Sequence, residues 1–187
     1  MNYLIVIFVL LLVIAPIISI LPSKRQKQQM NFRQEARALG VNVALVKIDD
    51  PDSDKEKYLS ATGRPLPREL DCIAYRKPRR RNDQLMGAKI PDWALVRDKS
   101  TGDQLQWVDD PPATMDTNFR AEIEHRANNL PTDVVRIDEI AQLVTIYWHE
   151  RSDELGLANI FDFLKVIVAL SPCSEKDSSS DSCSLDD

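Results

Sequence analysis

The sequence predicts an α+β protein with an N-terminal transmembrane helix, a juxtamembrane helix, and then a small, mostly antiparallel sheet with two or three helices. Three observations predict this order. The first 23 residues carry no charged side chain. Short β-branched and aromatic runs between turn residues indicate strands, and two later segments combine helical spacing with capping residues. The predicted parts are residues 1–22 (transmembrane helix), 23–40 (basic juxtamembrane helix), 41–170 (cytoplasmic α+β domain) and 171–187 (disordered acidic tail).

The first segment has the length and composition of a membrane span. From Tyr3 to Leu21 nearly every residue is Leu, Ile, Val or Phe, and as a helix this stretch is about 28 Å long, close to the hydrocarbon thickness of a bilayer. A cleaved signal peptide is the alternative, but the stretch has no preceding basic residue and no small-x-small cleavage site. Basic residues cluster directly after the stretch, so we expect a single-pass protein with its N-terminus outside and its C-terminal domain in the cytoplasm.

A helix from about Lys24 to Leu39 should follow. Ser23 and Gln26 form a capping-box pattern, and Gly40 stands where a left-handed C-cap belongs. The cations of this helix either set the membrane topology or bind anionic headgroups of the lipid bilayer. The dense basic run from Arg76 to Arg81 is either a solvated loop or a second lipid contact. The candidate membrane-surface residues are Lys24, Arg25, Lys27, Arg33, Arg37, Arg79, Arg80 and Arg81.

Composition limits the classes of function. The chain has 24 basic and 29 acidic residues, a net charge of −5 and a pI near 5.1, which argues against a nucleic-acid partner. Its three cysteines lack CxxC spacing, so we expect neither disulfides nor a zinc site. We expect no cofactor.

The remaining segments are assigned in chain order. Strands are predicted at Val41–Ile48 and Cys72–Tyr75, and a hairpin at Trp93–Arg97 and Gln104–Val108 with Trp93 and Trp107 packing together. Helices are predicted from about Met115 to Asn128, capped by Asp116 or Thr117, and from Asp153 to about Leu170. Leu130 to Ile140 is interpreted as a short helical turn. Leu143–Trp148 alternates as a strand does, although a helix from Thr132 to Arg151 would also satisfy the pattern.

Catalytic and metal-binding motifs are sparse. Asp50, Asp52 and Asp54 have the spacing that begins a calcium loop, but the glycine and the distal Glu are missing. His125, His149 and Glu150 are conceivable as the site of a membrane-held hydrolase, because histidine and carboxylate side chains form acid/base sites. A third histidine is missing, and a surface ion pair between Glu150 and Arg151 is the favoured interpretation. We therefore expect a non-enzymatic protein.

Two motifs carry a family resemblance. The run LPSKRQKQQMNFRQEARALG from Leu21 to Gly40 and the later YWHER from Tyr147 to Arg151 resemble a family of small, uncharacterised, single-span inner-membrane proteins of Gram-negative bacteria. Some members of that family are labelled YajC-like preprotein translocase subunits. The resemblance implies a location in the inner membrane and no catalytic residue. The expected function is a binding or accessory module of an integral-membrane protein complex, with a YajC-like translocase accessory as the alternative.

Overall fold

The computed structural model describes residues 3, 5, 7, 10, 12, 23–51, 56–79, 90–97 and 103–172. The chain divides into two units, Met1–Glu35 and Ala36–Asp187.

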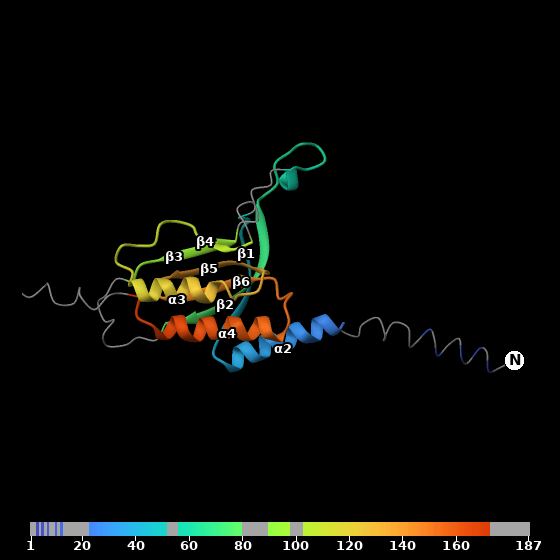
Figure 1. Cartoon of the computed structure of the whole chain (residues 1–187). Helices are drawn as coiled ribbons and strands as arrows, with labels where there is room; N and C mark the ends of the chain where they lie inside the picture. The colour runs from blue at the N-terminus through green and yellow to red at the C-terminus, as the bar shows by residue number, and fades with distance from the viewer. Residues whose placement is uncertain are drawn as a thin grey trace, which may run out of the picture. The chain divides into compact units, whose positions relative to one another are not determined.

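The second unit is built on a six-stranded sheet in which every neighbouring pair is antiparallel (Figure 1). Its spatial order is β1-β2-β6-β5-β3-β4. The strands are β1 (Asn42–Asp49), β2 (Glu69–Pro78), β3 (Trp93–Arg97), β4 (Leu105–Trp107), β5 (Val134–Ile140) and β6 (Leu143–Trp148). The helices of the described residues are α2 (Lys24–Ala38), α3 (Thr117–Ala127) and α4 (Glu154–Ala169), with a short 3-10 helix, η1 (Glu56–Tyr58).

The helices α3 and α4 cover one face of this sheet (Figure 1). Phe119 of α3 contacts Trp93 edge to face, with ring centroids 6.3 Å apart, and Phe161 of α4 stacks on Tyr75. Tyr75 in turn meets Trp148 edge to face at 5.2 Å. Aromatic pairs of this kind add to the stabilisation from apolar burial, so the core lies between the two helices and the central strands.

Several expected elements are confirmed, and all of them carry a local signal. Ser23 and Gln26 form the predicted capping box, with Ser23 N donating to Gln26 Oε1 at 2.8 Å and Gln26 N donating to Ser23 Oγ at 3.2 Å. Gly40 has a positive φ of 72° at the end of α2, as the C-cap requires. Asp116 and Asp153 cap α3 and α4.

The hairpin and the last strand are confirmed as well. β3 and β4 pair antiparallel, and the rings of Trp93 and Trp107 lie 5.9 Å apart. Leu143–Trp148 is a strand, so the alternative of one long helix is wrong.

The transmembrane helix expected over residues 1–22, and with it the single-pass fold class, is corrected by the structure. In the described part of the chain no helix is long and apolar enough to cross a membrane. The longest of these helices, α4, has 16 residues, or about 24 Å, which is short of a bilayer's hydrocarbon core of about 30 Å. Most of residues 1–22 and the tail from 173 onward lie outside the described residues. The corrected class is α+β with a six-stranded antiparallel sheet.

The helical turn expected between Leu130 and Ile140 is also wrong, because Val134–Ile140 forms the strand β5. Asp138 and Glu139 break the apolar pattern of this strand, yet both are buried. The register of β5 against β6 also shifts between Val134 and Arg136, and an extra residue in one strand interrupts the alternation of its side chains.

One end of the sheet continues as a two-stranded ribbon. β6 pairs with β2 only from Ile73 onward, whereas β1 pairs with β2 from Glu69. The ribbon therefore extends past β6 and ends in η1 and a turn that Leu59 and Pro65 close by a β-bridge (Figure 1).

Candidate functional site

A pocket of about 340 Å³ lies between this ribbon and the adjacent ends of β5 and β6. That volume falls in the range of small-molecule sites. The described residues that line the pocket come from five separate parts of the chain, and they are Asp50, Pro51, Lys57, Leu70, Arg97, Thr132, Asp133, Val134, Val135, His149, Arg151 and Ser152. None of these five parts has a motif that sequence reasoning could have assigned to a common site.

Asp133 organises one wall of the pocket. Its carboxylate accepts hydrogen bonds from the backbone N–H of Arg151 at 2.6 Å and of Ser152 at 3.3 Å, and from the hydroxyl of Ser152. Its carbonyl oxygen accepts from the backbone N–H of His149 at 3.2 Å. A single acidic side chain thus fixes the loop that connects β6 to α4.

Arg97 of β3 holds the backbone of the same wall by hydrogen bonds. Its Nε donates to the carbonyl of Val134 at 2.8 Å, and its guanidinium also donates to the carbonyls of Pro131 and Asp103. Burial lowers the pKa of Arg97, and the nearby carboxylate of Asp103 partly offsets the effect. Because these donors hold backbone carbonyls, Arg97 is a positioning residue for the pocket.

On the side of the β1–β2 ribbon, the carboxylate of Asp50 also lines the pocket and is hydrogen-bonded within the protein. Asp50 is almost fully buried and accepts from Lys57 Nζ at 2.7 Å and from the hydroxyl of Tyr58. The hydrogen bond with Asp50 raises the pKa of Tyr58 and also that of Lys57. Asp50, Asp52 and Asp54 had suggested the start of a calcium loop. Asp50 instead forms the ion pair with Lys57, and Asp52 and Asp54 lie outside the described residues.

The geometry is not that of a Ser–His–Asp triad. In such a triad the imidazole stands between the hydroxyl and the carboxylate, whereas here the hydroxyl of Ser152 donates directly to Asp133. Among the described residues there is also no group of three His, Cys, Asp or Glu side chains placed to hold a metal ion. The arrangement fixes loops and presents a charged cavity.

The expected triplet of His125, His149 and Glu150 does not share a site. Only His149 lines the pocket, whereas His125 is exposed on α3. Glu150 is buried, and its carboxylate accepts from the hydroxyl of Tyr75 at 2.9 Å. The expected surface ion pair between Glu150 and Arg151 is therefore wrong.

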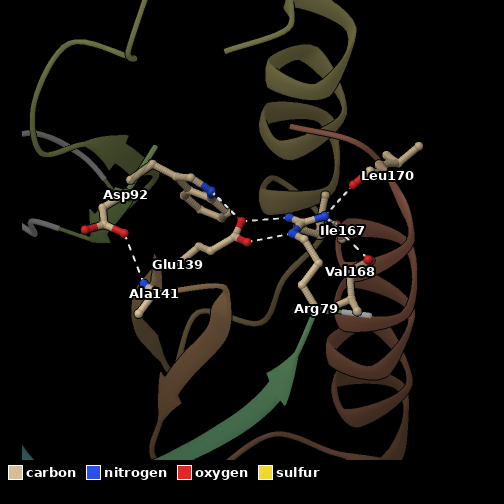
Figure 2. A network of polar contacts seen from close by, with 8 residues as sticks. Arg79, Asp92, Glu139, Ala141, Ile167, Val168 and Leu170 are labelled. Atoms are coloured by element: carbon tan, nitrogen blue, oxygen red, sulfur yellow. Dashed lines mark hydrogen bonds and ion pairs between the residues drawn. The ribbon is translucent and has the colours of Figure 1, made fainter. Parts of the chain in front are cut away.

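Arg79, expected at a membrane surface, is instead 5% exposed. Figure 2 shows its guanidinium facing the carboxylate of Glu139, with Nε and Nη2 each donating at 2.7 Å. Trp93 Nε1 donates to the same carboxylate at 2.8 Å. Arg79 Nη1 also donates to the carbonyls of Ile167 and Val168 in the last turn of α4 and to that of the C-cap residue Leu170. The side chain of Arg79 therefore caps the C-terminal end of α4, and the carboxylate of Glu139 neutralises its charge.

The other candidate cations divide into two groups. Lys24, Arg25, Lys27 and Arg37 are exposed on α2, and Arg33 is half-buried there. Arg80 and Arg81 lie outside the described residues. A lipid-binding role for these side chains stays a prediction.

Comparison of the chain with protein family models, with curated protein sequences and with solved structures finds no match.

Proposed function

We propose that this protein is a non-enzymatic binding module, and that the pocket between the β1–β2 ribbon and the ends of β5 and β6 holds its ligand. The observation that carries the proposal is that both carboxylates among the described lining residues are already hydrogen-bonded. Asp50 and Asp133 both accept hydrogen bonds from their own chain, so they support walls and are poorly placed to act as general bases, which must reach a substrate proton.

Ligand-observed NMR on the full-length protein tests this proposal with a mixed library of neutral, cationic and anionic small molecules. Thr132→Trp places a large ring in the pocket from an exposed position. Thr117→Trp makes the same change at an exposed position on α3 that does not line the pocket. We expect ligands that bind the wild type and Thr117→Trp but lose binding to Thr132→Trp.

Two outcomes would refute the proposal. Hits that bind Thr132→Trp as well as the wild type would place the binding site elsewhere. Conversion of a bound hit into product over hours of incubation would make the protein an enzyme. The YajC-like accessory role and the inner-membrane location stay predictions from the sequence. Crosslinking in cells that never captures a translocase component would refute the YajC-like accessory role.

A further inference from the structure

We infer that the pocket selects a small ligand carrying an oxyanion, either a carboxylate or a phosphate, and that the guanidinium of Arg151 is its main contact. This inference rests on the proposed function, because it names the ligand class of the same pocket.

The sign of the ligand follows from the pocket lining. Among the described residues that line the pocket, Lys57, Arg97 and Arg151 are cationic, while Asp50 and Asp133 are the two carboxylates. A ligand cation would therefore meet an excess of like charge. An anion would meet a favourable field in a site that is partly shielded from water, where charge interactions are stronger than in bulk solvent.

The acceptor capacity of the two acids points the same way. Asp133 already accepts three hydrogen bonds, and Asp50 accepts from Lys57 and from Tyr58. A carboxylate offers about four lone-pair sites in all. A ligand that needs strong acceptors finds few here.

Free donors remain on the cationic side. The guanidinium of Arg151 makes no hydrogen bond or ion pair with another described residue, and the side chain is exposed where it lines the pocket. Its backbone is held by Asp133 at 2.6 Å, so the side chain starts from a fixed point. A planar guanidinium matches the two oxygens of a carboxylate or phosphate with parallel hydrogen bonds. The ammonium of Lys57 donates to Asp50 at 2.7 Å and lies 5.3 Å from the ring centroid of Tyr58. An ammonium has three hydrogens, so Lys57 can add a second cationic contact.

The test titrates inorganic phosphate and, separately, succinate into ¹⁵N-labelled full-length protein at constant ionic strength. We expect saturable shifts of the backbone amides of Thr132, His149, Arg151 and Ser152. Arg151→Gln should weaken binding about 10-fold or more, as loss of a charged hydrogen bond does. Arg151→Lys keeps the charge but loses the fork, so its affinity should lie between the two. Arg120→Gln removes an exposed arginine of α3 and should leave the affinity unchanged.

The outcomes separate the possible ligands and the two proposals. Saturation by phosphate alone identifies a phosphate ligand, and saturation by succinate alone identifies a carboxylate. Shifts that rise linearly without saturation for both probes, or equal affinity of Arg151→Gln and the wild type, would overturn the inference. If a neutral library member binds and Thr132→Trp abolishes that binding while neither anion binds, the oxyanion inference fails and the proposed binding function stands.

Discussion

Removing Arg79 should destabilise this protein more than any surface substitution. The Arg79→Met variant retains much of the side-chain volume but leaves the carboxylate of Glu139, which has no exposed surface, without its cation. Breaking a buried ion pair by removing one partner costs about 3–5 kcal/mol. The carbonyls at the end of α4 lose a donor in addition.

The measurement is urea unfolding of the full-length protein, followed by tryptophan fluorescence and circular dichroism. With a denaturant slope of about 2 kcal/mol per M, the expected loss moves the midpoint down by about 2 M. Arg120→Met is the matched control, because that side chain is half exposed and its ion pair with Glu124 joins neighbouring turns of one helix, which is worth less than about 1 kcal/mol.

A double-mutant cycle separates the ion pair from the packing. Arg79→Met combined with Glu139→Gln buries no net charge, so we expect the double variant to be less destabilised than the sum of the single variants, by about 1–3 kcal/mol. An Arg79→Met midpoint equal to that of Arg120→Met would refute the reasoning, since it would mean that Glu139 is not a desolvated charge.

Three further predictions test other parts of the structure. Gly156→Ala should lower stability by about 1–3 kcal/mol although alanine favours helices, because its Cβ would lie 2.7 Å from Ser152 Cβ; a higher thermal midpoint would contradict this. Burial raises the pKa of Asp138 above its ordinary 3.8, so the folded state holds this proton more tightly than the unfolded chain. The resulting stabilisation is present below pH 3.8 and is lost as the pH rises through the folded-state pKa of Asp138. In urea titrations, the stability of the wild type relative to Asp138→Asn should therefore fall over that pH window. A rise in this relative stability would mean that folding lowers the pKa of Asp138. Burial raises the pKa of Cys72 to about 11. Iodoacetamide at pH 8 should therefore leave Cys72 unmodified in native buffer and alkylate it in urea, as mapped by mass spectrometry. Rapid labelling of the native protein would instead show an accessible thiolate.

Local signals in the sequence predicted the parts of the fold that depend on neighbours in the chain. The caps at Ser23, Gly40, Asp116 and Asp153 are where the residue types indicated. Such residues act through hydrogen bonds within three or four positions, so their effect is visible without knowledge of tertiary structure.

The errors arose where a partner lies far away in the sequence. Arg79 stands in a basic run, and nothing nearby reveals that Glu139, 60 residues later, neutralises it. Glu139 also made the strand β5 hard to predict from the sequence. A charged residue is rarely buried unless it is paired, so a carboxylate in this segment argued against a buried strand as long as its cation was unknown. The pocket could not be predicted either, since Asp133 and Lys57 are brought to it by the pairing of strands that are distant in the chain.

The pairing of β2 with β6 also bears on how the protein is made. Ile73 of β2 lies opposite Trp148 of β6, and the ribosome adds about half of the second unit between these two residues. Until β6 leaves the exit tunnel, the β1–β2 hairpin has no neighbour to cover its inner edge. The nascent chain therefore has to wait for its last third before the two halves of the sheet can join, and such late, long-range closure is slow and exposes unpaired edges to other chains.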